Sequence, residues 1–251
     1  MKFSIITCTF NSEDYIQTNI DSVKSQVFKD FEHVFIDGFS TDKTIEIIKN
    51  YQKEFSDKVK IFQFAPKGIS NAMNRGVENS NGDYLIHLHS DDSFYDEKVL
   101  SKISALIKNN NNPDWIYGKA NFIDIATEKS RIIPHRKIYQ KIRFWLLLIT
   151  NYIPHQSVFV KKQVFNKFGL FEETYKNSMD YEMWLRLSKN KIKSLFVNEI
   201  ICNFTVRKDS QSGLGKSNNE HYLAHKKHLK KTFLIKILEI INRINKKRNI
   251  L

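Results

Sequence analysis

The sequence contains little cysteine and no long hydrophobic run. Its 251 residues include two cysteines, Cys8 and Cys202, which lie 194 positions apart without a CxxC pair or a histidine at metal-binding spacing. Two isolated thiols do not build a disulfide framework, and they favour a reducing compartment. Cys8 lies within an apolar run, which is typical of a small core residue rather than a nucleophile.

Targeting and membrane-spanning patterns are also missing. The first apolar run begins at Phe3, after a single lysine, and no small-residue cleavage site follows it. The longest hydrophobic stretch, residues 144–149, is far shorter than the roughly 20 residues that cross a bilayer. These absences predict a protein that stays in the cytoplasm.

Charge is abundant and unevenly distributed. The chain carries a net charge of +13, and residues 221–251 alone contain nine Lys or Arg and one Glu. Nucleic acid, an anionic membrane surface or a phosphorylated substrate would each explain this bias, and composition does not choose among them. The 41% of hydrophobic residues excludes a disordered chain.

The first ninety residues alternate between strand-like and helix-like segments. Apolar, β-branched runs predict strands over residues 2–9, 31–37, 59–64 and 84–88, with helices between them. Such alternation with short loops predicts an α/β fold with a mostly parallel sheet and helices on both faces. Ligands of these folds bind beyond the carboxyl ends of the strands, where this sequence places Asn11, Asp37, Lys67 and residues 89–92.

The remainder of the chain divides less regularly. A main domain is predicted over residues 1–208, with further helices over 97–108 and within 171–187, and a strand over 115–125. Residues 209–220 have the composition of a flexible connector. Residues 221–251 predict a basic amphipathic helix, which either lies on an anionic membrane or packs on the domain. Residues 136–148 combine basic and apolar side chains in a similar way.

Two adjacent carboxylates, Asp91 and Asp92, follow the fourth predicted strand directly. By themselves they are compatible with a solvated turn. Because adjacent carboxylates repel one another unless a cation is shared, they also fit a site for Mg²⁺ or Mn²⁺ bound together with substrate phosphates.

These residues carry a resemblance to the family 2 glycosyltransferases, inverting enzymes with the GT-A fold that include bacterial polysaccharide and O-antigen (lipopolysaccharide) transferases. The resemblance covers roughly residues 1–206. Its motifs occur in the family's order: residues 7–11 (TCTFN), 37–42 (DGFSTD), 67–70 (KGIS) with Ala72, Asn74 and Gly76, 81–83 (NGD), 89–92 (HSDD) and 180–187 (DYEMWLRL).

The resemblance implies a role for each matching residue. The residues expected to bind a nucleotide-sugar donor, most often a UDP-sugar, are Thr7, Thr9, Asn11, Asp37, Gly68, Asn74 and Asp91. Asp37 is also explained as a turn cap before Gly38, and Asn74 as a structural residue. His155 and Arg186 are candidates for contact with the acceptor or a phosphate. Both also have ordinary structural explanations.

Metal and base positions follow from the same resemblance. The chain has His89 where family members often have Asp, so the carboxylate pair is Asp91–Asp92, with Asp92 expected as the direct ligand and Asp91 as the alternative. Asp180 occupies the position of the base that takes the acceptor's proton, and it is also expected to be the N-cap of the helix that follows, a role compatible with that of the base.

The sequence therefore predicts a metal-dependent inverting glycosyltransferase. Its acceptor would be a glycan or a polyprenyl-diphosphate-linked sugar at the inner face of the cell membrane, with no nucleic acid partner. One alternative is a sugar-1-phosphate nucleotidyltransferase, which would carry a basic Gly-rich loop where this chain has the acidic residues 10–14. The other is a non-catalytic basic module that binds nucleic acid, which would not need the four aspartates at strand and helix ends.

Overall fold

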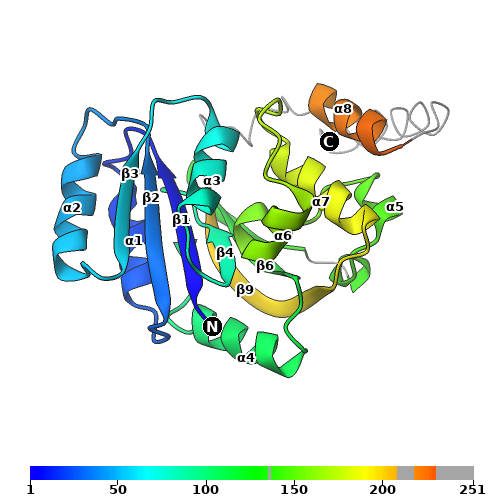
Figure 1. The fold of residues 1–251 in the computed structure, drawn as a ribbon, viewed down its shortest axis with the longest axis horizontal. Helices are drawn as coiled ribbons and strands as arrows, with labels where there is room; N and C mark the ends of the chain where they lie inside the picture. The colour runs from blue at the N-terminus through cyan, green and yellow to red at the C-terminus, as the bar shows by residue number, and fades with distance from the viewer. Residues whose placement is uncertain (135–136, 208–217, 230–251) are drawn as a thin grey trace.

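A single mixed sheet organises the protein (Figure 1). The computed structural model describes residues 1–134, 137–207 and 218–229. Its strands are β1 (Phe3–Thr9), β2 (Phe31–Asp37), β3 (Val59–Gln63), β4 (Tyr84–His87), β5 (Ser93–Phe94), β6 (Trp115–Asp124), β7 (Lys129–Ile133), β8 (Val158–Lys161) and β9 (Ser194–Val206). Its helices are α1 (Ile16–Lys24), α2 (Thr44–Glu54), α3 (Ile69–Glu78), α4 (Val99–Asn109), α5 (Phe144–Leu147), α6 (Lys162–Phe168), α7 (Met179–Lys189) and α8 (Asn218–His228), with 3₁₀ turns η1 (Lys137–Gln140) and η2 (His155–Ser157).

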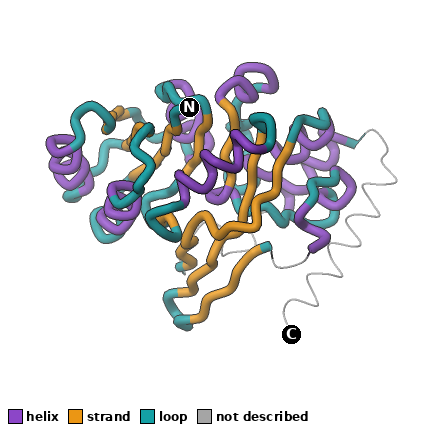
Figure 2. Tube along the Cα trace, turned by 90° about the horizontal axis from the view of Figure 1, so that it is seen from below, coloured by secondary structure: helices purple, strands orange, loops and turns teal. Residues whose placement is uncertain are grey.

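The sheet has two halves that meet at β8. Strands β3, β2, β1 and β4 are parallel neighbours, and β8 then pairs antiparallel with both β4 and β6. Strand β9 lies parallel to β6 on its other side, and β7 extends β6 as an outlying hairpin (Figure 2). Every residue of β1 and β2 is buried, which explains why these strands are apolar on both faces.

Helices cover both faces of the sheet. Apolar side chains of α3 and α7 pack in one cluster with Ile6 and Val34, while those of α1, α2 and α4 pack against the opposite face. Helix α3 approaches β1 closely at Gly76, where an added Cβ would lie 2.2 Å from Cγ2 of Ile6. Because Gly76 has no side chain, α3 can pack closely against β1, the strand that leads into the site.

The predicted elements and the observed ones agree closely in the first half of the chain. The strand predicted over residues 31–37 is β2 without change, and the other three predicted strands differ by one residue at an end. The α/β fold with helices on both faces is confirmed. Residues 209–217 of the predicted connector and residues 230–251 of the predicted basic helix lie outside the described residues, and α8 begins at Asn218, inside the predicted connector.

Candidate active site

A cavity of about 530 Å³ opens at the carboxyl ends of β1 and β4. One wall is formed by Cys8, near the end of β1, and by His89 and Asp91, which follow β4. Residues 151–156 form a second wall and the start of α7 forms a third. Of the polar strand ends predicted to converge, only the one after β4 lines this cavity, through residues 89–91, and segments from the second half of the chain supply the other walls.

Asp91 lines this cavity and forms an ion pair with an arginine of the same chain. Its Oδ2 is 3.1 Å from a guanidinium nitrogen of Arg207, which follows β9, and the Asp91 side chain is 19% exposed. The same guanidinium stacks over the ring of Tyr15 at 3.8 Å from its centroid. A carboxylate and a fixed arginine therefore stand side by side where a diphosphate and its cation would be expected.

Asp92, unlike its neighbour, is buried and does not line the cavity. It is 1% exposed, and its Oδ1 accepts the backbone N–H of Thr205 at 3.1 Å. Burial raises the pKa of Asp92 well above its ordinary value and the neighbouring Asp91 charge raises it further, against the opposing effects of the Thr205 N–H and the Gln156 amide. Among the described residues that line the cavity, Asp91 is present and Asp92 is absent.

Three histidine rings stand together beside Asp91. The His155 ring lies 5.5 Å from His87 and 5.3 Å from His89, centroid to centroid. Burial, followed by the nearby His89 and His87, lowers the pKa of His155 well below its ordinary value, so the ring is neutral. Neither ring nitrogen of His155 has a hydrogen-bond partner among the described residues. His155 lines the cavity, but both of its ring nitrogens are buried from solvent in this structure.

Asp180 is the second carboxylate of the cavity. It is the second residue of α7, and the helix is preceded by Ser178 at the cap position, so Asp180 is not the N-cap. Its Oδ1 accepts the Tyr181 N–H at 2.7 Å. Burial raises the pKa of Asp180 to about 6, although hydrogen bonds from Tyr181 and Asn151 oppose the shift. A carboxylate with this pKa is largely ionised at neutral pH and accepts a proton more readily than an ordinary aspartate.

The residues predicted to surround the donor's base form a hydrogen-bonded network of their own. Asp37 is fully buried and accepts bonds from Thr9 Oγ1 (2.9 Å), from the Ser40 hydroxyl and N–H, and from Gln63. Asn11 accepts the Thr41 N–H at 2.9 Å and so joins the loops after β1 and β2. The hydroxyl of buried Thr7 donates to the Leu88 carbonyl. In this structure Asp37 acts as a turn and loop anchor.

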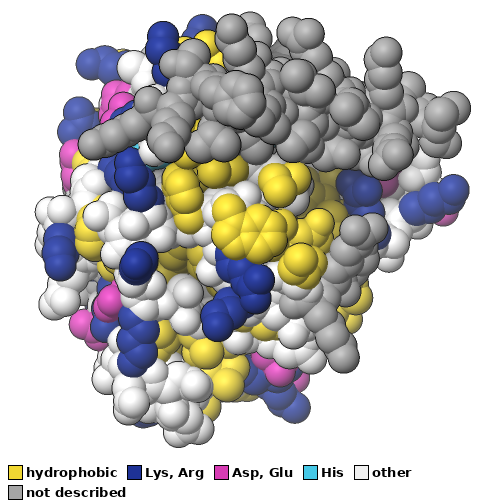
Figure 3. All heavy atoms as spheres, turned by 90° about the vertical axis from the view of Figure 1, so that its right-hand side faces the viewer, with side chains coloured by type: hydrophobic (Ala, Val, Ile, Leu, Met, Phe, Trp, Pro, Cys, Tyr) yellow, Lys and Arg dark blue, Asp and Glu magenta, His cyan; other side chains and the backbone are white. Residues whose placement is uncertain are grey.

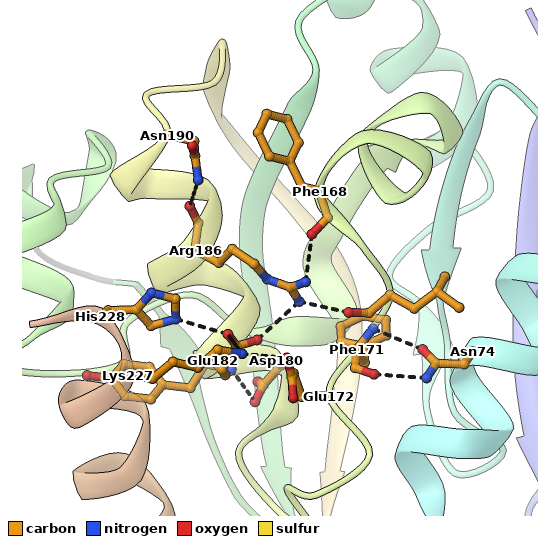
Figure 4. Close-up of polar contacts among 12 residues, drawn as sticks. Asn74, Phe168, Phe171, Glu172, Asp180, Glu182, Arg186, Asn190, Lys227 and His228 are labelled. Carbon is orange, nitrogen blue, oxygen red and sulfur yellow. Dashed lines mark hydrogen bonds and ion pairs between the residues drawn. The ribbon is translucent and has the colours of Figure 1, made fainter.

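Three other predicted residues have structural contacts. Asn74 bonds through both its oxygen and its nitrogen to the backbone of Phe171, and Arg186 donates to the carbonyls of Phe168 and Leu170 (Figure 4). Gly68 precedes α3 with φ of 96°, a backbone conformation that favours glycine. Among the described residues that line the cavity, Gly68, Asn74 and Arg186 are absent.

Sequence reasoning missed several residues that line the cavity. The main ones are Arg207, Asn151 and Lys176. Arg207 and Lys176 bring positive charge to the site, and Asn151 contacts Asp180. None of them lies in a recognisable motif, because each enters the cavity from a loop or strand end of the second half.

The acidic groups of the cavity fit a divalent cation. Carboxylate oxygens are the donors that Mg²⁺ and Mn²⁺ prefer, and Asp91 brings one such group to the cavity, while Oδ2 of the adjacent buried Asp92 has no hydrogen-bond partner among the described residues. Across the part of the chain that the structure describes, no three His, Cys, Asp or Glu side chains gather as a metal site. The protein thus offers one or two carboxylates, as sites completed by substrate phosphates do.

Comparison with known sequences identifies the family. Residues 4–169 match the profile described as "Glycosyl transferase family 2". The chain belongs to glycosyl transferase family 2. It is 29% identical over 188 residues to a "PGL/p-HBAD biosynthesis glycosyltransferase" of Mycobacterium tuberculosis, covering 75% of this chain and 70% of the relative. It is also 28% identical to an "Uncharacterized glycosyltransferase" of Rickettsia typhi, with 73% and 57% covered.

Solved structures show the same fold. The S. aureus TarS fragment crystallised with UDP-GlcNAc superposes with a TM-score of 0.74 at 20% identity, covering 95% of this chain and 66% of that one. The mannosyltransferase PcManGT of Pyrobaculum calidifontis, in complex with GDP-Man and Mn²⁺, gives 0.62 at 14% identity, covering 90% and 61%. This family 2 glycosyltransferase therefore has the GT-A fold, and it spans about two thirds or less of these structures. The nucleotidyltransferase and nucleic-acid-binding alternatives have no support in the family match.

Proposed function

We propose that this family 2 glycosyltransferase transfers a sugar, with inversion, from a UDP-sugar to a hydroxyl of a polyprenyl-diphosphate-linked glycan in the synthesis of a bacterial surface polysaccharide. The observation that carries the proposal is that a candidate diphosphate site and a candidate base line the same cavity. Asp91 and Arg207 provide a diphosphate site at one wall, and Asp180, with a pKa of about 6, provides a base at another. UDP is favoured because TarS was crystallised with UDP-GlcNAc.

The reaction is a single displacement at the anomeric carbon. The acceptor hydroxyl, oriented between Asn151 and Lys176, attacks as its proton passes to the Asp180 carboxylate, and the bond to the nucleoside diphosphate breaks. Arg207 stabilises the negative charge that develops on the leaving diphosphate. A Mg²⁺ or Mn²⁺ ion held by Asp91, with Asp92 behind it, would supply further charge stabilisation when bound. Asp91 replaces Asp92 as the expected direct ligand because only Asp91 lines the cavity.

Membrane association is a second part of the proposal. Trp145 on α5 is 51% exposed, and the Arg143 guanidinium lies 5.8 Å from its ring centroid. Figure 3, which views the side of the molecule on which Figure 1 shows α5, displays exposed hydrophobic side chains with Lys and Arg beside them. Apolar side chains with adjacent basic ones suit an anionic lipid surface. No helix among the described residues has the length and apolar character to cross a bilayer.

A donor and acceptor screen tests the proposed function. The protein is incubated with UDP-, GDP- and dTDP-sugars and Mn²⁺, and nucleoside diphosphate release is measured with and without short polyprenyl-diphosphate glycans. We expect release from UDP-sugars that rises when the acceptor is added and stops with chelator. Formation of a nucleotide sugar from a sugar phosphate and a nucleoside triphosphate would instead identify a nucleotidyltransferase.

A further inference from the structure

One carboxylate of α8 holds three consecutive backbone N–H groups in front of α7. The Glu220 side chain accepts from the N–H of Lys176 at 2.8 Å, of Asn177 at 2.9 Å and of Ser178 at 2.8 Å. Ser178, at the cap position of α7, makes no side-chain cap bond of its own. The segment that leads into α7 is therefore fixed by an ionised side chain from another helix, through bonds stronger than neutral ones.

Helix α8 also contacts α7 at residues beyond Glu220. Buried Glu182 lies 2.9 Å from both Lys227 Nζ and His228 Nε2, and Figure 4 shows it between these residues and Arg186. The His225 Nε2 is 2.8 Å from the Tyr181 hydroxyl, whose own proton goes to the Leu147 carbonyl. These contacts run along α7, so the place of Glu220 beside the start of α7 is set by packing and not by a single bond.

The segment held by Glu220 belongs to the cavity. Lys176 and Asn177 line it, and Asp180 follows two residues after Ser178. Movement at residues 176–178 would therefore move the carboxylate of Asp180 relative to the acceptor. Misplacement of a reacting group by about 1 Å is enough to lower a rate by about 100-fold.

Glu220 also adds negative charge near Asp180. Burial is the main cause of the raised Asp180 pKa of about 6, and the Glu220 charge acts in the same direction. The other charged and titratable groups of the cavity lining are Lys176 beside α7, Tyr152 and His155 from residues 151–156, and Cys8, His89, Asp91 and Arg207 at the sheet, while His221 on α8 stacks near Tyr181. Burial lowers the pKa of His221 to about 4, so it carries no charge at neutral pH.

We propose that Glu220 is a positioning residue for the transfer reaction: it sets the place of Asp180 by fixing residues 176–178 and holds a negative charge beside the start of α7. The proposal rests on the role of Asp180 in the proposed function. It assigns a task in the acceptor half of the site to α8, a helix outside the matched family profile, which ends at residue 169.

Two variants of Glu220 separate position from charge. Glu220→Gln keeps the size and removes the charge, whereas Glu220→Asp keeps the charge and draws it back by one methylene. We expect single-turnover transfer to fall by about 10- to 100-fold in both. The acidic limb of the pH–rate profile should move to lower pH in Glu220→Gln only, because a like charge near Asp180 has been removed. Donor affinity should stay near that of the wild type in both.

Glu172→Gln is the matched control. Glu172 pairs with Lys227 at the same helix interface, without a bond to residues 176–178. Glu172→Gln should change neither the transfer rate nor the position of the acidic limb of the pH–rate profile. A Glu220→Gln enzyme with wild-type rate and limb would overturn the proposal. A Glu220→Gln enzyme with a lowered rate but an unchanged acidic limb would also overturn the proposal, because this result would indicate a purely structural defect. Asp180→Asn is measured in parallel: if it retains transfer, the role of Asp180 fails independently of Glu220.

Discussion

The guanidinium of Arg207 lies 3.1 Å from the Asp91 carboxylate and stacks on Tyr15, so the carboxylate that we propose as the metal ligand is already paired with a cation. A divalent cation at Asp91 has to compete with this arginine. The diphosphate of a bound donor would attract both the metal ion and the Arg207 guanidinium, so the two cations would no longer compete for Asp91 alone. Metal and nucleotide should for this reason bind together more tightly than either binds alone.

Arg207→Met should therefore have opposite effects on metal binding and on turnover. We expect tighter Mn²⁺ binding without nucleotide, because Asp91 is released, and slower transfer by about 10²- to 10³-fold, because one stabilising group is lost. Calorimetric Mn²⁺ titrations with and without UDP measure the first effect. Arg143→Met, a change at α5 outside the cavity lining, serves as the control. Weaker Mn²⁺ binding in Arg207→Met would contradict the competition.

The two adjacent aspartates should respond differently to loss of charge. Asp91→Asn should abolish Mn²⁺-dependent UDP binding with little change in melting temperature, because this side chain reaches the cavity. Asp92→Asn retains an oxygen for the Thr205 N–H and should weaken UDP binding less. Calorimetry with and without chelator distinguishes them. Complete loss of binding in Asp92→Asn alone would return the ligand role to Asp92.

Asp180→Asn should lower transfer by about 10²- to 10⁴-fold while UDP affinity and melting temperature remain near wild type. Because the amide still accepts the Tyr181 N–H, the start of α7 is retained. In the wild type the rate should rise with pH through about 6, since the base must be ionised to accept a proton. Normal turnover in this variant would move the base to another group, with Glu173 or Glu182 tested next.

Glu32 should govern part of the stability at acidic pH. It is buried, and although burial raises its pKa, hydrogen bonds from Lys60, Asn81 and Ser4 lower it to about 2. A lowered folded-state pKa stabilises the fold above the unfolded value and loses that effect as pH falls. We expect the melting temperature to drop between pH 4.5 and 2. Glu32→Gln should flatten this drop, and an unchanged pH dependence would show that other carboxylates cause it.

Truncation after Leu229 tests membrane binding without disturbing α8. Residues 230–251 contain seven Lys or Arg and one Glu. Their removal should release the protein from anionic vesicles and preserve UDP-sugar hydrolysis, because the contacts of Lys227 and His228 with Glu182 remain. Full co-sedimentation of the truncated protein would direct attention to Trp145, with Trp145→Ala as the next variant.

The sequence permitted a close prediction of the first half of the fold. Strands such as β2 are short, apolar and buried on both faces, and polar turns bound them, so local pattern is sufficient. The second half was less predictable because its pairing is non-local. Strand β8 has four residues, and nothing in them indicates that they lie between β4 and β6.

The candidate site shows the same division. Asp91 and Asp180 occupy the cavity that their motifs indicated, whereas Asp37 and Asn74 have hydrogen bonds that a motif does not report. Which member of an Asp-Asp pair faces a cavity depends on the turn after β4 and on the Thr205 N–H, 113 residues away. Arg207 reaches Asp91 only through the pairing of β9 with β6, which no local pattern reveals.

The position of β8 has a consequence for synthesis of the chain. Strands β1 to β4 are made first, but the outer edge of β4 stays open until residues 158–161 have left the ribosome. An open, apolar strand edge is a template for pairing with another chain. We therefore expect a fragment that ends near residue 150 to aggregate, and a nascent chain to need shielding over that interval until β8 closes the sheet.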